Sequence, residues 1–127
     1  MLKYAMNPDP KKSVKVYGRA LRVSRKSSVT VCREISGKSL KKGKALLEDL
    51  VSKKRSLNGK YYTNVSTELL ELLKSSENNA EFKGLDTDKM IINASAHKGF
   101  SFQRPRKSKM GRMKRKMSNI QIVLIQG

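Results

Sequence analysis

Apolar and polar residues alternate along three stretches of the chain, and a period of two is typical of β-strands. The alternation is longest in residues 90–103, where the even positions carry most of the apolar side chains as far as Phe102. Residues 120–125 alternate in a similar way. In residues 13–24 the apolar positions change parity around Gly18. This change predicts a strand that contains a β-bulge at the glycine.

Three other stretches repeat their apolar residues at the helical spacing of three or four positions. Ser24 and Ser39 are suitable N-caps for the first two helices, and the third helix is expected to begin at Asn64 or Ser66 and to end at Gly84. The predicted buried faces comprise Val29, Cys32 and Ile35 in the first helix, Leu40, Ala45, Leu46, Leu47, Leu50 and Val51 in the second, and Val65, Leu69, Leu72, Leu73, Ser76 and Ala80 in the third.

These elements, a strand followed by three helices and two further strands, predict an α+β chain. The last two strands flank a basic segment with turn signals at Pro105 and Gly111, so we expect them to form a long protruding hairpin with a basic tip. A chain of 127 residues is too short for two separate cores, which favours one domain. Within residues 1–127 we expect an extended N-terminal leader (1–12), a strand with three helices (13–88), and the hairpin (89–127) with its tip near 104–112.

The charge is very uneven along the chain. Lys and Arg number 29 against 10 acids, a formal net charge of +19. Residues 1–33 carry nine basic residues and one acid, residues 34–88 carry ten and nine, and residues 89–127 carry ten and none. A segment without acids suits a polyanionic surface, and its hydrophobic alternation argues against a disordered basic tail. Nucleic acid is the expected partner, ahead of a membrane surface or of no specific polyanion.

Cysteine and histidine occur once each, which makes a disulfide framework impossible within the chain and a four-ligand zinc site unfavourable. We expect Cys32 to be a small buried hydrophobe, because nothing near it in the sequence would activate a thiol. Glu68 and Glu71 are interpreted as surface acids. No apolar run is long enough to span a bilayer. We therefore expect no enzymatic activity, no cofactor, no bound metal and no membrane partner.

The candidate nucleic-acid-binding residues lie just before the first strand, on it, just after it, and on the hairpin. They are Lys12, Lys15, Arg19, Arg22, Arg25, Lys26, Lys98, Phe100, Phe102, Arg104, Arg106, Lys107, Lys109, Arg112, Lys114, Arg115 and Lys116. The cations would neutralise phosphates, and the two phenylalanines would either stack on bases or pack on each other across the strands. His97 is interpreted as a polar group that faces RNA. Lys41, Lys42 and Lys44, at the start of a helix, weakly suggest another phosphate nearby.

Several motifs, in order along nearly the whole chain, resemble the large-subunit ribosomal protein family numbered twenty-two in the universal scheme and seventeen in eukaryotes. The strongest are Val16-Tyr-Gly-Arg-Ala-Leu-Arg-Val-Ser-Arg-Lys26, Ile35-Ser-Gly-Lys-Ser39, Gly84-Leu-Asp-Thr-Asp88, Arg104-Pro-Arg106 with Gly111-Arg112, and Ser118-Asn-Ile-Gln-Ile-Val-Leu124. Each motif alone is weak, but their order and spacing are specific. The opening Tyr4-Ala-Met-Asn-Pro8 and a link over residues 53–64 that is longer than in bacterial members resemble the archaeal and eukaryotic type.

The resemblance implies an α+β fold in which three helices pack on a small three-stranded antiparallel sheet with a long protruding basic β-hairpin. It also implies a structural, non-enzymatic protein of the cytoplasmic ribosome. It implies binding to large-subunit ribosomal RNA during assembly, contact with neighbouring proteins including ribosomal protein four, and one copy per ribosome rather than a homo-oligomer. It also places the hairpin tip in the wall of the peptide exit tunnel, where it would meet the nascent peptide transiently. The tip residues implied are Arg104, Pro105, Arg106, Lys107, Ser108, Lys109, Met110, Gly111 and Arg112.

Two other interpretations remain open from the residues. An architectural DNA-binding protein also uses basic β-arms with a proline near the tip, and such proteins are usually intimate dimers. A small enzyme acting on RNA is less well supported, because the sequence offers no histidine pair, metal cluster or paired catalytic acid.

Overall fold

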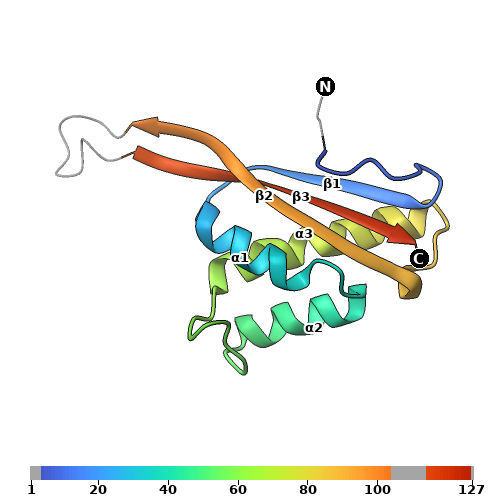
Figure 1. The fold of residues 1–127 in the computed structure, drawn as a ribbon, viewed down its shortest axis with the longest axis horizontal. Helices are drawn as coiled ribbons and strands as arrows, with labels where there is room; N and C mark the ends of the chain where they lie inside the picture. Colours follow the sequence, from blue (N-terminus) through green and yellow to red (C-terminus); the bar gives the residue numbers. More distant parts are fainter. Residues whose placement is uncertain (1–3, 104–113, 127) are drawn as a thin grey trace.

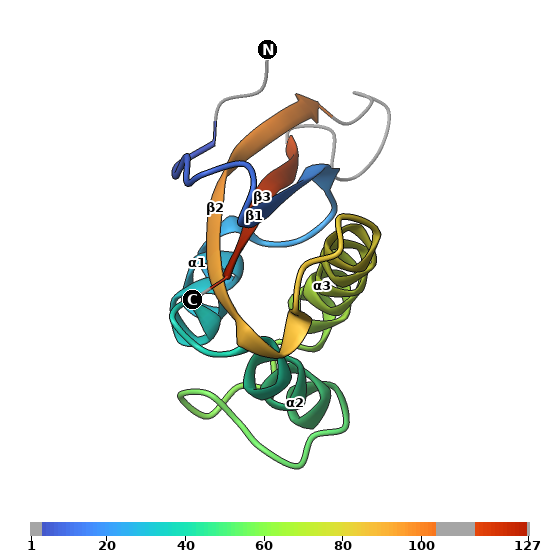
Figure 2. The ribbon, with the colours of Figure 1, turned by 90° about the vertical axis from the view of Figure 1, so that its right-hand side faces the viewer.

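Three helices cover one face of a three-stranded sheet in the computed structural model, which describes residues 4–103 and 114–126 (Figure 1). The elements are β1 (Ser13–Leu21), α1 (Arg25–Ile35), α2 (Leu40–Val51), α3 (Thr63–Phe82), a 3-10 turn η1 (Thr87–Lys89), β2 (Met90–Gln103) and β3 (Lys114–Gln126). In the view of Figure 2, α1 and α3 lie on either side of β2, and α2 lies below them. The predicted α+β class, with three helices and a three-stranded antiparallel sheet, is confirmed.

The sheet has the order β1-β3-β2, so β3 is central and pairs antiparallel with both neighbours. The ladder with β1 ends at the pair of Leu21 with Ser118. The ladder with β2 continues to the pair of Gln103 with Lys114. Residues 101–103 and 114–116 therefore form a two-stranded segment beyond the three-stranded sheet. The predicted hairpin tip lies outside the described residues.

A β-bulge interrupts β1 where the change of parity predicted one. The register with β3 shifts between Gly18 and Leu21. Ala20 adopts a left-handed φ of 55° there, and its backbone N–H donates a hydrogen bond of 2.8 Å to Oδ1 of Asn119. A side chain of the central strand thus satisfies the backbone donor that the bulge releases from the ladder.

A second bulge, on β2, was not predicted. The register with β3 shifts between Lys98 and Ser101, and a Cβ added to Gly99 would lie 2.9 Å from the carbonyl oxygen of Met117. The close approach of the two backbones explains the glycine. One extra residue reverses the faces of a strand, so the alternation is not continuous through residues 90–103. Phe100 consequently does not extend the buried row and is 67% exposed.

The core lies between the sheet and the helices, and it corrects two of the predicted helix faces. Val31, not Val29, is fully buried in α1. In α2 Gly43 is buried and Ala45 is exposed. A Cβ at Gly43 would clash with the side chain of Ile92, so α2 meets β2 at this glycine. The predicted residues Leu72 and Val51 are only partly buried.

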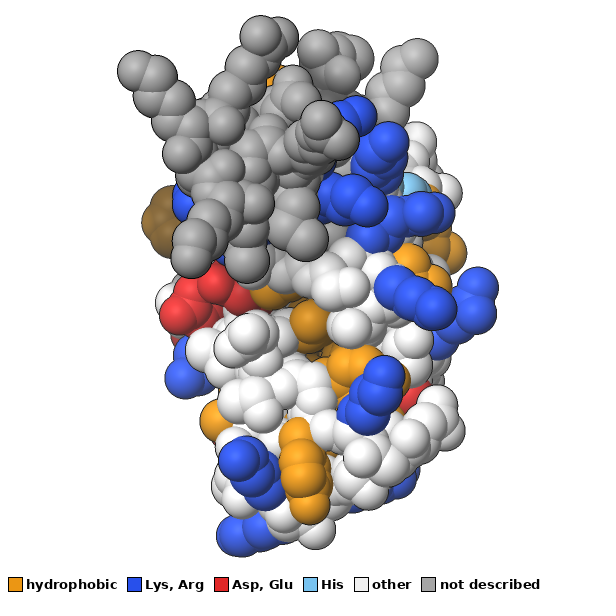
Figure 3. All heavy atoms as spheres, turned by 90° about the vertical axis from the view of Figure 1, so that its left-hand side faces the viewer, with side chains coloured by type: hydrophobic (Ala, Val, Ile, Leu, Met, Phe, Trp, Pro, Cys, Tyr) orange, Lys and Arg blue, Asp and Glu red, His pale blue; other side chains and the backbone are white. Residues whose placement is uncertain are grey.

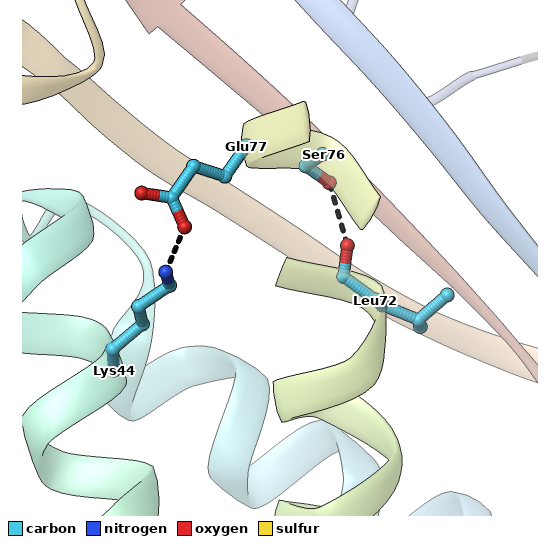
Figure 4. A network of polar contacts seen from close by, with 4 residues as sticks. All are labelled: Lys44, Leu72, Ser76 and Glu77. Atoms are coloured by element: carbon cyan, nitrogen blue, oxygen red, sulfur yellow. Dashed lines mark hydrogen bonds and ion pairs between the residues drawn. The ribbon is translucent and has the colours of Figure 1, made fainter. Parts of the chain in front are cut away.

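Acidic partners account for two of the lysines at the start of α2. Lys44 forms an ion pair with Glu77 of α3, and this pair joins the two helices (Figure 4). Lys41 lies 3.1 Å from a carboxylate oxygen of Asp88. The structure therefore gives no support to the suggested phosphate contact at these two lysines.

Cys32 is 2% exposed within the face that α1 turns to the core, as predicted for a small buried hydrophobe. Burial raises the pKa of its thiol from an ordinary value of 9.0 to about 12. The thiol therefore stays protonated at neutral pH and is a poor nucleophile.

Candidate nucleic-acid interface

A groove of about 1050 Å³ lies where the two-stranded segment leaves the rest of the fold. Its walls come from the turn between β1 and α1, the first residues of α1, the first residues of α3, and the strands β2 and β3 near the second bulge. Within the described part of the chain, six lining residues are basic and none is acidic. The basic ones are Arg22, Arg25, Lys26, Lys98, Lys114 and Lys116.

Figure 3 looks at the face of the molecule that contains this end of the sheet. Lys and Arg side chains gather along one flank of the face, and a small acidic group lies on the opposite flank. Positive charge is therefore concentrated on one flank of this face.

Hydrogen bonds to β3 fix the turn that carries Arg22 and leads into α1. The Oγ of Ser118 donates to the carbonyl oxygen of Val23 at 3.0 Å. The Nη1 of Arg22 donates to the carbonyl oxygen of Lys116, also at 3.0 Å. This bond uses one of the five N–H donors of the guanidinium. Arg22 is therefore held across the central strand with most of its donors still able to bind an anion.

Two helices start at the groove. Ser24 caps α1, its Oγ accepting a hydrogen bond from the backbone N–H of Ser27, and Ser24 to Ser27 line the groove. The first residues of α3 line it too, after Tyr62, which has a left-handed φ of 46°. Helix N-termini carry partial positive charge and usually attract acids. Neither first turn contains one. Cations and helix dipoles therefore add to one electropositive potential.

The structure brings together some of the predicted RNA-binding residues and separates others. The six groove cations all belong to the predicted set. Arg19 is exposed near the bulge of β1, and Arg115 is exposed on β3. Lys12 and Lys15 lie at the other end of β1, far along the ladder from the groove. The Nζ of Lys15 donates to Oδ1 of Asn7 at 2.9 Å and lies 5.3 Å from the ring centroid of Tyr4.

The remaining predicted residues lie on the two-stranded segment or beyond it. Phe100 is on the surface of β2, next to the groove-lining Gly99. Phe102 pairs with Arg115 in the ladder, but its side chain lies outside the described residues, as do residues 104–113. The choice between stacking on bases and packing across the strands therefore stays a prediction. His97 is exposed, with its Nε2 3.3 Å from Oγ of Ser95.

Sequence reasoning missed the contribution of α3 to this site. Tyr62, Thr63, Asn64 and Val65 line the groove, although they lie far in sequence from the basic segments. The only signal was the turn sequence Asn58-Gly59, which predicts that the chain reverses shortly before α3. That signal places a turn but does not say which end of the sheet the helix start will meet.

Within the described ranges, no group of three or more His, Cys, Asp or Glu side chains is placed to hold a metal ion. In the same part of the chain, no helix combines the length and the apolar character needed to cross a membrane. Together with the groove, the fold defines a small basic α+β protein with an acid-free recess at one end of its sheet.

The comparisons with known proteins assign this class more narrowly. Residues 16–125 match the family described as Ribosomal protein L22p/L17e. The chain is 32% identical to the large ribosomal subunit protein uL22 of Methanococcus aeolicus, over 97% of this chain and 95% of that protein. It is 38% identical to the uL22 of Pyrobaculum calidifontis, over 76% of this chain and 64% of that protein.

The chain belongs to the L22 family of ribosomal proteins and to its archaeal type. The family is a structural, non-enzymatic component of the large ribosomal subunit, which places the chain in the cytoplasm as part of the ribosome. The resemblance seen in the ordered motifs is confirmed, and so is the expectation that the protein is not an enzyme.

Proposed function

We propose that the chain binds ribosomal RNA through the groove and the neighbouring cations of β3, and that it organises this RNA while the large subunit assembles. The observation that carries the proposal is the groove itself. Six cations from three separated parts of the sequence converge there with two helix starts, and no acidic residue is among its described lining residues.

The mechanism follows from this electrostatics. Lys and Arg side chains neutralise backbone phosphates and release the counterions condensed on the RNA, which makes binding strongly dependent on salt. The recess and the fixed position of Arg22 favour a folded RNA of matching shape over a particular linear sequence. Recognition by shape suits a protein that joins RNA segments that are distant in sequence.

The finer parts of the proposal rest on the resemblance of the ordered motifs. Residues 1–127 act as one domain, with a single copy in each ribosome. Residues 104–112 form the tip of the hairpin and contribute to the wall of the peptide exit tunnel, close to ribosomal protein four and to the passing nascent peptide. A combined substitution of Arg104, Arg106 and Arg112 is expected to impair subunit assembly or tunnel behaviour while leaving the folding of the helices intact. Near-normal subunits carrying this triple change would contradict the tunnel assignment.

The first experiment is sedimentation of a native lysate on a sucrose gradient, with a parallel wash at high salt. The chain should migrate with the large subunit and with whole ribosomes, and it should resist moderate salt. The variant Arg25→Gln/Lys26→Gln/Lys98→Gln removes half of the groove cations and should dissociate at lower salt. A matched control removes three exposed lysines outside the groove: Lys11→Gln, Lys74→Gln and Lys89→Gln.

The control loses as much charge as the groove variant. It should nevertheless behave like the unaltered chain, because its lysines lie outside the groove. Equal dissociation of the two variants would mean that only total charge matters, and it would overturn the role of the groove. Recovery of the unaltered chain only in light fractions or on chromatin would overturn the ribosomal assignment of the interface.

A further inference from the structure

The molecule has a second basic surface, and it contains none of the candidate residues named so far. The loop of residues 53–60, between α2 and α3, carries four exposed cations: Lys53, Lys54, Arg55 and Lys60. No acid occurs in the sequence between Asp49 and Glu68. The loop thus repeats, within the otherwise balanced middle of the chain, the charge pattern of the groove.

The backbone of this loop has a defined conformation. Asn58 and Gly59 both adopt left-handed φ values, of 52° and 79°, as the central residues of a type I′ turn do. The flanking residues Leu57 and Lys60 exchange two backbone hydrogen bonds, of 2.8 and 2.9 Å. Leu57 is 8% exposed and belongs to the hydrophobic core. The turn therefore holds Lys60 outward on a backbone that is anchored beneath it.

The start of the loop is also anchored, at the end of α2. The backbone N–H of Lys54 donates to the carbonyl oxygen of Asp49 at 2.9 Å, and that of Lys53 to Leu50 at 3.3 Å. The C-terminal dipole of a helix favours cations by about 0.3–1 kcal/mol at an exposed position. This effect accounts for one or two lysines after α2. It does not account for all four cations.

The four cations are not neutralised by the protein. Among the residues that the structure describes, ion pairs join Lys41 to Asp88 and Lys44 to Glu77, and no others are formed. Lys53, Lys54 and Arg55 are consecutive, so their charges repel each other within one Debye length, about 8 Å at physiological ionic strength. An anionic partner would remove this repulsion.

The loop lies at the same end of the molecule as the groove. Figure 1 shows the connection between α2 and α3 below the starts of α1 and α3, at the end where the two-stranded segment leaves the sheet. Tyr62 to Val65, which begin two residues after the loop, line the groove. In Figure 3 further Lys and Arg side chains lie at the lower end of this face.

We propose that the 53–60 loop is a second phosphate-contact surface, so that ribosomal RNA engages this face at two places, the groove and the loop. Interfaces with proteins are depleted in lysine and anchored by buried aromatic residues, whereas phosphate contacts are made mainly by Lys and Arg. A loop with three lysines and one arginine favours RNA. The inference rests on the ribosomal RNA binding proposed above, but it concerns a surface that lies apart from the groove cations.

The first test measures the salt dependence of binding to deproteinised large-subunit RNA from the cells that supply the chain. The variant Lys53→Gln/Lys54→Gln/Arg55→Gln/Lys60→Gln keeps every backbone hydrogen bond of the loop. Each phosphate contact contributes about 0.7–0.9 to the slope of log affinity against log salt. The slope should fall by about two to four. A control of equal charge changes exposed cations elsewhere: Lys11→Gln, Arg33→Gln, Lys74→Gln and Lys89→Gln.

The control should change the slope by less than the contribution of one phosphate contact, which is about 0.7–0.9. Equal slopes for the two variants would overturn the proposal, since they would show an effect of total charge alone. Far-UV circular dichroism and melting confirm that both variants are folded. If the unaltered chain itself shows no salt-dependent binding, the proposed function fails. If the unaltered chain binds but the loop variant has the same salt slope as the unaltered chain, the loop inference alone fails.

The second test locates the loop on the RNA by cleavage from a tethered iron chelate. The chelate is attached at Ser56→Cys, an exposed uncharged position within the loop. The natural Cys32 is buried with a pKa raised to about 12, so it does not compete for the reagent. Cuts at defined nucleotides of reassembled subunits are expected, with few from the control Ser75→Cys, exposed on α3. Absence of cuts from Ser56→Cys in incorporated protein would overturn the proposal and indicate a protein neighbour.

Discussion

Lys44 and Lys98 show how differently the two regions of this molecule use the same side chain. Lys44 of α2 forms an ion pair with Glu77 of α3, so its charge joins two helices. Lys98 lines the groove, where the described residues include no acid. The charges of the helical body stabilise the folded chain. Those of the groove repel each other in the free protein, which is the pattern expected of a surface completed by a polyanion.

The same contrast divides a single strand. Ile92 of β2 is fully buried against the helices, whereas Phe100, on the same strand, is 67% exposed. The bulge at Gly99 separates them. Apolar burial therefore stabilises β2 before the bulge, and the ladder with β3 continues after it. The body should depend on packing, and the basic end should depend on backbone geometry and on its partner.

The most severe way to break this comparison is to make a cavity in the body. Leu69 of α3 is fully buried, and Leu69→Ala is expected to lower the free energy of unfolding by about 2–5 kcal/mol. Denaturation in urea measures the change. Where the variant remains folded, the salt slope of RNA binding should not change, because no groove cation has moved. Lys74→Ala, exposed on the same helix, should stay within about 0.5 kcal/mol of the unaltered chain.

A smaller effect is expected at the junction of the two regions. In Gly99→Ala the new Cβ would lie 2.9 Å from the carbonyl oxygen of Met117 and 3.1 Å from Oδ1 of Asn119. Backbone cannot move aside as a flexible side chain can, so we expect a loss of about 1–3 kcal/mol. Amide hydrogen exchange should accelerate in residues 101–103 and 114–116 more than in the pairs of β1 with β3. Uniform acceleration throughout the sheet would contradict a local role for this bulge, and Ser101→Ala serves as the control.

The sequence predicted most of the fold because its signals were local and periodic. The bounds of β2 and the N-caps Ser24 and Ser39 agree with the structure. The errors arose where tertiary contacts decide. Val29 and Val31 are equivalent by composition, and only the direction in which α1 packs buries Val31. Gly43 was not among the residues predicted to be buried in α2, but it is the place where Ile92 approaches.

The candidate site was predictable in composition but not in arrangement. The two strongly basic segments, residues 1–33 and 89–127, identified the cations of the groove, because charge is visible in a sequence. The convergence of Lys26, Lys98 and Lys116 depends on the sheet order and on the second bulge, which no local pattern specifies. The cations of the 53–60 loop were overlooked because acids elsewhere in the middle of the chain balance them in a sum over residues 34–88.

A cap at the edge of the groove gives a finer comparison. The Oγ of Ser24 accepts a hydrogen bond from the backbone N–H of Ser27 at 3.4 Å, a long bond. Ser24→Ala should therefore cost about 0.5–1 kcal/mol, at the low end for an N-cap. Ser39 caps α2 without a side-chain hydrogen bond, so Ser39→Ala should cost less. Thermal melting of both variants measures the difference, and a larger loss for Ser39→Ala would show that the α1 cap does not contribute through this bond.

The smallest effect belongs to the buried thiol of the body. The pKa of Cys32 is about 12 in the folded chain, against an ordinary value of 9.0 that applies when the chain unfolds. As pH rises toward and past 9.0, the unfolded state releases its proton while the folded state keeps it, so stability falls with pH. The loss between pH 8 and pH 9 is roughly 0.4 kcal/mol, and urea denaturation of the unaltered chain and of Cys32→Ala at both pH values isolates it. No groove cation takes part in this effect. If the free energy of unfolding of Cys32→Ala declines by the same amount, other groups cause the pH dependence and the thiol does not contribute to it.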